Sequence, residues 1–527
     1  MSLLPSLLLT ASFVAAAASP AGPPSGPNGP HRTHPPPSPP GPHGAVGPCD
    51  IYASGGTPCV AAHSTTRALF GTYTAPLYNV IRGSDNLTIA ITPMNAGGVA
   101  NAGLQDQFCT GTTCLISMIY DQSGHGNDLS QAPSGGAAYG EANGFDFAAS
   151  AVGAPVTLNG HKAYGVFIQP ASGYRIDNTN DIAVANEPEG IYAVLDGTHY
   201  NGACCFDYGN AEVSNTDTGA GHMEALYFGS NTGFYGSGSG PGPWFMADME
   251  NGLYAEGNRS VNPNDPTITY RFTHGVVKGN TSNHWAIRGA NAQSGPLDTF
   301  YSGPRPQGYY PMQKSGAIIL GIGGDNSDGS QGTFYEGAMT KGYPADEIED
   351  SVQANIVAAK YDTTSLTSGP KLFAGSDISV QVGYPSGSNQ YMVHNGTTVY
   401  LEDVTSSSGE NLKEMATFTV TIGNANGNCF SYESLENPGS YLRHSGYKLY
   451  CDPDDGTLLF AGDSTFCPEA GLDGQGTSFR SWSYPTRYWR RYDGSVYIGQ
   501  NGGPFEFDSS YDYNDQASWF VRSGFVG

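Results

Sequence analysis

The chain is poor in charge, and poorest in positive charge. Only 13% of its 527 residues are charged, and 47 acidic residues outnumber 22 Lys and Arg residues. The formal net charge of −25 argues against nucleic acid and anionic membrane surfaces as partners. After the N terminus, no stretch approaches the roughly 18–20 unbroken apolar residues of a membrane span. The abundant Gly, Ser, Thr, Asn and Tyr are typical of many-turned β domains and suit a neutral, hydroxyl-rich ligand such as a sugar.

Motifs of several enzyme classes are also missing. The sequence has no P-loop, no G-x-S-x-G elbow, no H-E-x-x-H and no C-x-x-C pair. The "DPDDG" stretch at 452–456 lacks the remaining spacing of a calcium loop, so a plain turn is expected there. We therefore expect no cofactor and no metal.

The N-terminal region has the pattern of an exported protein. Residues 1–19 read as a signal peptide, an apolar run that ends in small residues, and the Pro/Gly-rich residues 20–48 read as a spacer. Four Asn-x-Ser/Thr sequons fit a secreted glycoprotein: Asn86, Asn258, Asn280 and Asn395. Nine cysteines in such a chain indicate disulfides and one unpaired thiol.

Two regions of different texture follow, as the length of the chain requires. Residues 49–365 alternate short apolar runs with Gly, Asn and Asp turns, which predicts strands. One helix is predicted at 344–361, because Ile348, Val352, Ile356 and Ala359 form one apolar face. The pattern favours a two-sheet sandwich with a terminal helix.

Residues 370–527 contain an internal repeat. "QYMVHNGTTVYLED", "SYLRHSGYKLYCDP" and "RYWRRYDGSVYIGQ" align, with Tyr391, Tyr441 and Tyr488 about fifty residues apart. Three β units of this length predict a trefoil. Its use in sugar binding is an analogy from the fold alone.

Acidic residues in two segments could carry glycosidase chemistry, which generally needs two carboxyl groups. In "PGPWFMADMENG", Asp248 and Glu250 alternate along a predicted strand, so both should project to one face, with Trp244 and Phe245 nearby to stack on a sugar. A solvated strand face is the alternative interpretation. In "GAIILGIGGDNSDGSQGTFYEG", a buried-looking strand runs into a Gly-rich loop with Asp325. An Asp in such a loop is most often a turn residue, but the preceding strand would fix the position of the loop.

Several segments together resemble one known family. "CDIYASGGTPCVAAHSTTRALF", "YDQSGHGNDLSQAP", "YAVLDGTHYNGACCFDYGNAE", "DMENG" and "GIGGDNSDGSQGTFYEG" resemble fungal α-L-arabinofuranosidases of glycoside hydrolase family 54. The repeat region resembles the arabinose-binding module of carbohydrate-binding family 42. The resemblance implies an all-β chain, a concanavalin-like β-sandwich followed by a β-trefoil. It further implies a secreted, retaining, exo-acting enzyme that releases terminal arabinofuranose from arabinoxylan, arabinan and related plant cell-wall polysaccharides. A monomer is expected.

The resemblance also implies roles for individual residues. Glu250 would be the nucleophile and Asp325 the general acid/base, with their carboxyl groups about 5–5.5 Å apart as retention requires. Asp248, Asn251 and Gly324 match positions that contact the sugar. The adjacent Cys204 and Cys205 would be bridged and form a wall of the sugar pocket; the alternative is that they belong to separate bridges. The other implied disulfides are Cys49–Cys59, Cys109–Cys114 and Cys429–Cys467, which leave Cys451 without a partner.

The chain departs from the family pattern in two places. A pocket-rim Trp is missing from "TGFYGSGSG", so Phe234 or Tyr235 would have to replace it. Sugar pockets of the trefoil use a His and an Asp. The second unit keeps both as His444 and Asp463, and the third keeps Asp515 but has Arg491 in place of the His. The first unit has Glu414 where the Asp would be, so we expect no pocket there.

Two alternative functions remain open at this point. A non-catalytic cell-wall lectin with two sugar-binding domains would bind polysaccharide without turnover. A related exo-glycosidase, such as a galactofuranosidase or an enzyme with β-xylosidase side activity, would differ in its initial rates on aryl glycosides.

Overall fold

The computed structural model describes residues 46–137, 144–234, 236–364, 371–384 and 388–526. The expected signal peptide, residues 20–45 of the expected spacer and Tyr235 lie outside the described residues. The chain is mostly β, with 43% of residues in strands, few helices and a closed barrel in the C-terminal region. No described helix combines the length and the apolar character needed to cross a membrane.

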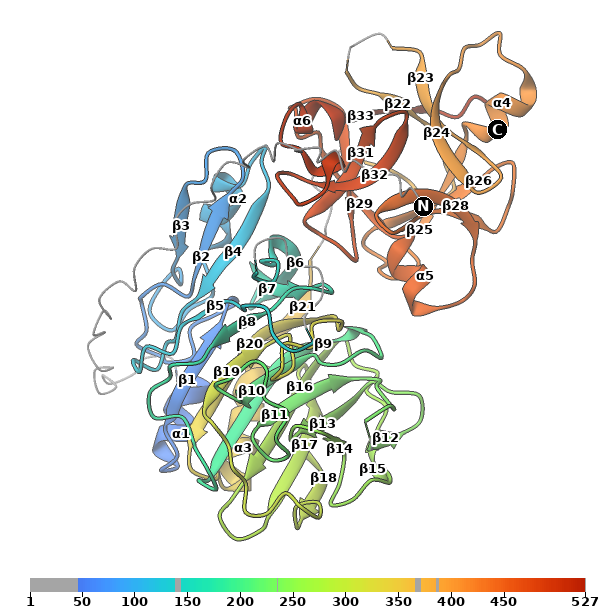
Figure 1. The fold of residues 1–527 in the computed structure, drawn as a ribbon. Helices are drawn as coiled ribbons and strands as arrows, with labels where there is room; N and C mark the ends of the chain where they lie inside the picture. The colour runs from blue at the N-terminus through green and yellow to red at the C-terminus, as the bar shows by residue number, and fades with distance from the viewer. Residues whose placement is uncertain (1–45, 138–143, 235, 365–370, 385–387, 527) are drawn as a thin grey trace, which may run out of the picture. The chain divides into compact units, whose positions relative to one another are not determined.

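The first region contains a 19-stranded hydrogen-bonded sheet (Figure 1). One run of antiparallel neighbours carries the candidate site and consists, in spatial order, of β8 (Tyr174–Ile176), β19 (Ala317–Leu320), β10 (Asp207–Ala211), β11 (Glu224–Gly229), β13 (Trp244–Asp248) and β14 (Leu253–Tyr254). A second run consists of β1 (Cys59–Ser64), β20 (Gly332–Lys341), β9 (Glu189–Tyr200), β16 (Phe272–Gly279), β17 (Trp285–Asn291) and β18 (Asp298–Gly303).

The main hydrophobic core includes side chains from both runs. Leu226 and Phe245 of the first run belong to the same buried cluster as Val194 and Val276 of the second. A Cβ on Gly275 of β16 would lie only 2.2 Å from the Phe245 ring. Glycine at this position therefore lets β16 and β13 approach closely.

The predicted helix is α3 (Asp346–Ala358), which begins after Ala345 and lies inside the predicted range 344–361. Val352 and Ile356 are buried, and Ile348 packs against the core, so the apolar face does face inward. Two short helices were not predicted, namely α1 (Pro48–Ser54) and α2 (Ala102–Phe108). Both are too short to show a helical apolar period, and α1 lies against α3.

The C-terminal barrel closes through strand pairing. β22 (Asp377–Val382) pairs with β25 (Phe418–Ile422), and the ring continues through β26 (Phe430–Ser434), β29 (Phe466–Ala470), β30 (Thr477–Ser481) and β33 (Trp519–Ser523), which pairs back with β22. Three hairpins pair with one another beside the ring: β23 (Gln390–Asn395) with β24 (Thr398–Asp403), β27 (Ser440–Ser445) with β28 (Lys448–Pro453), and β31 (Arg487–Tyr492) with β32 (Ser495–Gln500). The short helices α4 (Glu410–Met415), α5 (Leu458–Asp463) and α6 (Tyr513–Gln516) recur once per repeat unit.

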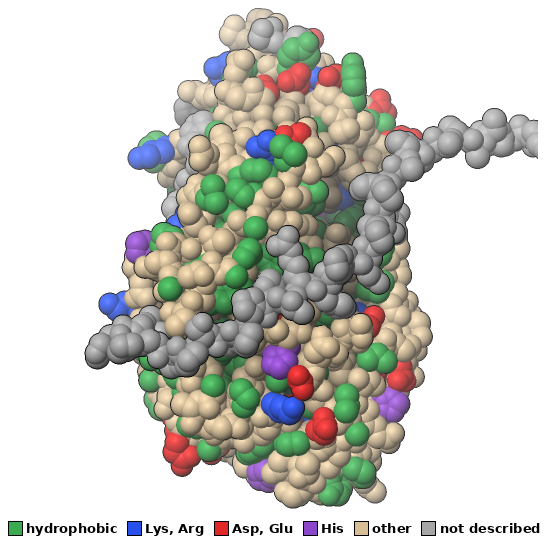
Figure 2. Space-filling model, turned by 90° about the vertical axis from the view of Figure 1, so that its left-hand side faces the viewer, with side chains coloured by type: hydrophobic (Ala, Val, Ile, Leu, Met, Phe, Trp, Pro, Cys, Tyr) green, Lys and Arg blue, Asp and Glu red, His purple; other side chains and the backbone are tan. Residues whose placement is uncertain are grey.

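Four disulfides are formed, in the pairs that the resemblance implies: Cys49–Cys59, Cys109–Cys114, Cys204–Cys205 and Cys429–Cys467. Cys451 is a buried free thiol. Among the sequons, Asn86, Asn258 and Asn395 are exposed and Asn280 is half-buried. On the face drawn in Figure 2, charged side chains are scattered among uncharged ones, in keeping with the low charge of the chain.

Candidate active site

The two candidate acids come from strands of the same run. Glu250 follows the end of β13, and Asp325 lies in the loop after β19. β10 pairs with β19 on one side and with β11 on the other, and β11 pairs with β13. The sheet thus brings two segments that are distant in the sequence to one site.

The predicted strand alternation of Asp248 and Glu250 is wrong in detail. β13 ends at Asp248, and Glu250 stands in a turn with φ of 56°, in the left-handed region. This conformation is uncommon for a residue other than Gly, Asn or Asp, and it often marks functional sites. Two hydrogen bonds fix it: Glu250 N–H donates to Asp248 Oδ1 (3.0 Å), and the Tyr309 hydroxyl donates to the Glu250 carbonyl oxygen (2.9 Å). Both acids are nevertheless buried in one cluster.

The two aromatic residues before these acids do not line a sugar cleft as expected. Phe245 is fully buried in the main core. Trp244 is buried too, and its indole N–H donates to the carbonyl oxygen of Ser239. Both faces of β13 are buried, so neither ring is exposed even though the two side chains point to opposite faces of the strand.

The loop that carries Asp325 runs alongside β10. Gly321, at the start of the loop, donates its N–H to the carbonyl oxygen of Asp207 (2.8 Å). Ser327, later in the loop, accepts at its carbonyl oxygen from Cys205 N–H (3.1 Å). Asp325 itself is half-buried, and its Oδ1 accepts from Ser327 N–H (3.0 Å). Gly324 is buried beside Glu212. The loop is therefore held in place by backbone contacts on both sides of Asp325, at Gly321 and at Ser327.

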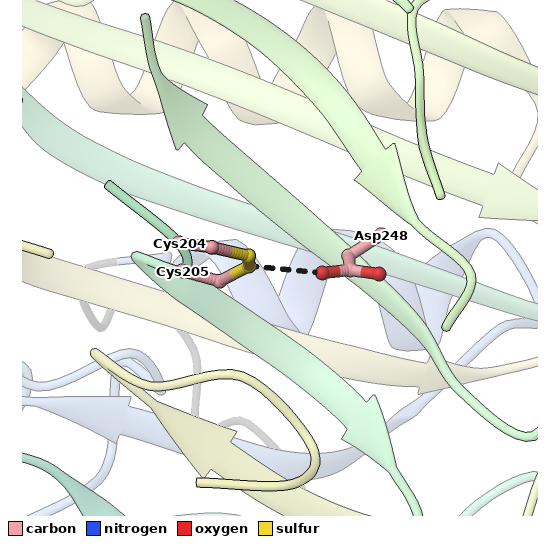
Figure 3. A group of neighbouring side chains, drawn as sticks. All are labelled: Cys204, Cys205 and Asp248. Carbon is pink, nitrogen blue, oxygen red and sulfur yellow. Dashed lines mark hydrogen bonds between the residues drawn. A yellow bond between two sulfur atoms is a disulfide. The ribbon is translucent and has the colours of Figure 1, made fainter. Parts of the chain in front are cut away.

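The bridged cysteines lie against Asp248 (Figure 3). The Sγ of Cys205 is 3.2 Å from Oδ2 of Asp248. A disulfide sulfur carries no hydrogen, so this contact is a hydrogen bond only when Asp248 is protonated and donates. Burial, together with the charge of Glu212, raises the pKa of Asp248 to about 7, which favours that state. Cys204 is half-buried, so the bridge reaches solvent on one side.

Five carboxyl groups influence one another at this site. Burial raises the pKa of Glu250 to about 11, and the neighbouring carboxyl groups of Glu212, Asp248 and Asp325 contribute in the same direction. Burial also raises the pKa of Asp207 well above its usual range, with the charge of Asp248 next in size, and burial raises that of Glu212. Carboxyl groups this close and this buried cannot all be ionised, so they share protons.

Asp207 and Glu212 were not among the predicted site residues. Both lie in "ACCFDYGNAE", where the sequence predicts a role only for the two cysteines. Asp207 begins β10 and Glu212 directly follows its end. Acidic residues at both ends of a fully buried strand would have been a usable signal.

Asn251 and Phe234, which were predicted to contact the sugar, are both exposed. The Asn251 side-chain amide donates to the carbonyl oxygen of Thr218. The backbone of Phe234 accepts a hydrogen bond from Leu253 N–H (2.9 Å), and its ring is 47% exposed. Asn251 directly follows Glu250 in the chain, and Phe234 is tied by its backbone to Leu253, three residues after Glu250.

The C-terminal region brings together the predicted pair of its second unit. His444 Nε2 lies 3.2 Å from Asp463 Oδ1, and both side chains are buried. Burial raises the pKa of Asp463 to about 7 and lowers that of His444 to about 3. In the third unit, the charge of Asp515 acts on Arg491. In the first unit, the acid beside His394 is Glu436, at 3.7 Å, rather than Glu414.

Comparison with known families gives two matches. The family model described as "Alpha-L-arabinofuranosidase B, catalytic" matches residues 48–362. The one described as "Alpha-L-arabinofuranosidase B (ABFB) domain" matches residues 382–521.

Individual relatives match over nearly their whole length. An alpha-L-arabinofuranosidase from Hypocrea jecorina is 60% identical over 92% of this chain and 96% of its own. An arabinofuranosidase/B-xylosidase from Trichoderma koningii has the same identity and coverage. The crystal structure of an arabinofuranosidase complexed with arabinofuranosyl-alpha-1,2-xylobiose is similar with a TM-score of 0.90 and 56% identity, covering 92% of this chain and all of that one.

Proposed function

Because this chain belongs to the α-L-arabinofuranosidase B family, it is a glycoside hydrolase, and we propose that Glu250 is its nucleophile and Asp325 its general acid/base. The observation that carries this proposal is the buried carboxyl cluster. Within this cluster, Glu250 is held in a constrained turn, and the charge of Asp325 contributes to raising its pKa. The match to α-L-arabinofuranosidases makes a terminal arabinofuranosyl group the substrate of this site.

In the first step, a carboxylate oxygen of Glu250 attacks the anomeric carbon of the arabinofuranose. The bond between that carbon and the glycosidic oxygen breaks, and Asp325 donates its proton to the leaving oxygen. The product is a covalent glycosyl ester on Glu250 and a free sugar chain. Two hydrogen bonds of the Glu250 backbone keep its carboxylate aimed during attack: its N–H donates to Asp248, and its carbonyl oxygen accepts from the Tyr309 hydroxyl.

In the second step, Asp325 acts as a base. It takes a proton from water, the water oxygen bonds to the anomeric carbon, and the ester bond to Glu250 breaks. Two inversions give net retention of configuration. The Cys204–Cys205 bridge forms an apolar wall of the pocket, and Asp248, Asn251, Gly324 and Phe234 contact the sugar. Gly324 does so through its backbone, because it has no side chain.

Variants of the two acids test this assignment. On p-nitrophenyl α-L-arabinofuranoside, Glu250→Gln should lose at least about 10⁴-fold in kcat, because no covalent step is possible. Asp325→Asn should lose about 10²- to 10⁴-fold on arabinoxylan, but less on the aryl substrate, whose leaving group needs little protonation. Added azide should then rescue Asp325→Asn and give an arabinosyl azide of retained configuration. An active Glu250→Gln variant, or an azide product of inverted configuration, would refute the assignment.

A non-catalytic lectin is not favoured, since the relatives and solved structures are hydrolases by name. A second activity does have support in one of them. The Trichoderma koningii relative is called an arabinofuranosidase/B-xylosidase. We therefore propose a β-xylosidase side activity, and initial rates on aryl β-xyloside and aryl α-L-arabinofuranoside would measure it.

We also propose the finer architecture. Residues 49–365 form a concanavalin-like β-sandwich, supported by the close approach of β13 to β16 across the core. Residues 370–527 form a β-trefoil, supported by the barrel with its three hairpins. The trefoil binds arabinose side chains at a pocket formed by His444 and Asp463. A second, modified pocket contains Asp515, with Arg491 in place of the histidine.

The cellular setting is proposed on the same grounds. The protein is secreted after removal of residues 1–19 and acts as a monomer on arabinose-containing plant cell-wall polysaccharides, without a cofactor. The exposed sequons at Asn86, Asn258 and Asn395 are open to glycosylation, and the half-buried Asn280 is less so. The relatives named above come from fungi and support this setting.

A further inference from the structure

The loop between β10 and β11, residues 213–223, has no role in the mechanism above, yet it contacts the segments of both proposed catalytic acids. Its sequence is "VSNTDTGAGHM", in which most side chains are small and uncharged. Gly219 and Gly221 make the backbone of the loop permissive, so contacts with other groups have to define its course. Asp217 and His222 are the only acidic and basic residues within it.

On one side, the loop anchors the turn that carries Glu250. Met249 and Asn251 are the residues directly before and after Glu250 in the chain. The carbonyl oxygen of Met249 accepts from Gly221 N–H (2.7 Å). The side-chain amide of Asn251 donates to the carbonyl oxygen of Thr218. Both neighbours of the proposed nucleophile are thus bonded to the loop.

On the other side, the loop packs against the segment of Asp325, with glycines in between. Gly136 N–H donates to the carbonyl oxygen of Asn215 (2.8 Å), and Ala137 N–H donates to that of Asp325 (3.1 Å). A Cβ on Gly135 would lie 2.4 Å from the carbonyl oxygens of Asn215 and Asp325 alike. Only glycine fits this gap, so the loop and the Asp325 segment approach each other closely.

Asp217 and His222 fix the course of the loop. His222 Nδ1 lies 2.7 Å from Asp217 Oδ2, and Gly219 N–H donates to Asp217 Oδ1 (2.9 Å). The bond with His222 holds the pKa of Asp217 below its usual value. At neutral pH the carboxylate therefore accepts and the Nδ1–H donates, whether the ring is neutral or charged. Thr218, whose carbonyl oxygen holds Asn251, lies within the span that these bonds close.

The turn of Glu250 depends on such anchors, because its left-handed backbone is uncommon for glutamate. Resting on the proposed role of Glu250 as nucleophile, we propose that Asp217 and His222 are positioning residues for it. Their hydrogen bond keeps the β10–β11 loop in the shape that holds Met249 and Asn251. Neither residue takes part in a proton transfer, so the proton balance of the reaction is unchanged.

Two substitutions of His222 test the role of the hydrogen bond. His222→Leu keeps much of the side-chain volume but removes the donor. A misplacement of about 1 Å in an active site can cost about 10²-fold in rate, and the loop acts at one remove from the carboxylate. On p-nitrophenyl α-L-arabinofuranoside we therefore expect kcat to fall about 10-fold, with KM within about twofold of wild type. His222→Asn carries its amide nitrogen on Cγ, where the ring carries Nδ1, so it can still donate to Asp217 and should recover most of the lost kcat.

Three results of these measurements would overturn the proposal. A His222→Leu enzyme with wild-type kcat and a lower melting temperature would show that the pair serves stability alone. A raised KM at unchanged kcat would place the loop in contact with the sugar rather than behind the nucleophile. Equal loss of kcat in His222→Asn and His222→Leu would show that the hydrogen bond is not the cause.

Gly219→Ala reaches the same hydrogen bond if His222→Leu does not fold. A Cβ at residue 219 would lie 2.2 Å from Nδ1 and Cε1 of His222, so it would displace the ring while both partners stay in the chain. The expected result is the same, a loss of about 10-fold in kcat at a nearly unchanged KM. A folded Gly219→Ala enzyme with wild-type kcat would contradict the positioning role.

His125 and Asp181 supply the matched control in the same region of the chain. Their Nδ1 and Oδ2 atoms lie 3.0 Å apart, and their side chains are 32% and 47% exposed, against 29% and 33% for His222 and Asp217. Among the described residues, no hydrogen bond or ion pair joins the control side chains to Glu250 or its neighbours in the chain. His125→Leu should therefore keep kcat within about twofold of wild type. An equal fall in His125→Leu and His222→Leu would reject a specific role for the β10–β11 loop.

Glu250→Gln, measured in parallel, separates this proposal from the one on which it rests. An active Glu250→Gln variant rejects the nucleophile itself. An inactive one, together with wild-type kcat in His222→Leu, rejects only the positioning role of Asp217 and His222.

Discussion

Substitution of Gly324 by alanine should disable the site while sparing the fold. The added Cβ would lie 1.8 Å from Oε2 of Glu212, whereas real Cβ atoms essentially never approach a neighbour within 3.0 Å. The carboxyl group would have to withdraw by more than about 1 Å, and it has little room because it is fully buried against Glu250. A displacement of this size in an active site can reduce the rate about 10²-fold. We expect such a loss in kcat/KM on the aryl arabinofuranoside.

Gly329 provides the control on the same loop. A Cβ there would have Ala203 as its nearest neighbour at 3.7 Å, an ordinary contact. Gly329→Ala should therefore keep kcat/KM within about twofold of wild type. Melting temperatures of both variants, measured by calorimetry, would show whether each is folded. A folded Gly324→Ala enzyme with wild-type kcat/KM would refute the claim that the contact with Glu212 constrains the site.

Three further outcomes follow from contacts described above. Tyr309→Phe removes the hydrogen bond to the Glu250 carbonyl oxygen, which contributes about 0.5–1.5 kcal/mol. We therefore expect kcat to fall roughly 2- to 10-fold with little change in KM. An unchanged kcat would mean that the turn keeps its conformation without this hydrogen bond. Asp463→Ala should weaken binding to insoluble arabinoxylan in a pull-down but leave aryl hydrolysis intact, and equal loss of both would contradict a separate binding role. The folded-state pKa of Asp248 is raised to about 7, so its protonation stabilises the fold fully below about pH 4, and this stabilisation is lost as the pH rises to 7. The thermal unfolding temperature of the wild type should accordingly fall over that range, and that of Asp248→Asn should fall less. An equal fall in wild type and variant would show that Asp248 does not cause this pH dependence.

Much of the site could be predicted because its segments carry recognisable local patterns. The buried-looking strand before Asp325 is β19, and the Gly-rich loop after it is indeed a loop. The helix at 344–361 was predicted from the spacing of its apolar residues, which are buried as expected at Val352 and Ile356. Such features depend on a few neighbouring residues and on side-chain periodicity, which a sequence shows directly.

What was missed depends on contacts between distant segments. The burial of Trp244 and Phe245 follows from packing on both faces of β13, which alternation along one strand does not reveal. The place of Glu212 in the carboxyl cluster follows from its position beside Glu250 and Gly324, each brought there by a different strand. The sharp turn at Glu250 is likewise imposed by partners such as Tyr309, because local propensity disfavours it for glutamate.

The left-handed backbone of Glu250 bears on how the enzyme could be converted from cutting sugars to joining them. A catalyst that lacks its nucleophile can transfer an activated arabinosyl fluoride to an acceptor, and its yield depends on an undistorted pocket. Glycine adopts a φ of 56° without penalty, whereas alanine or serine pays about 1 kcal/mol there. Glu250→Gly is therefore the synthetic variant whose main chain would best keep its native course.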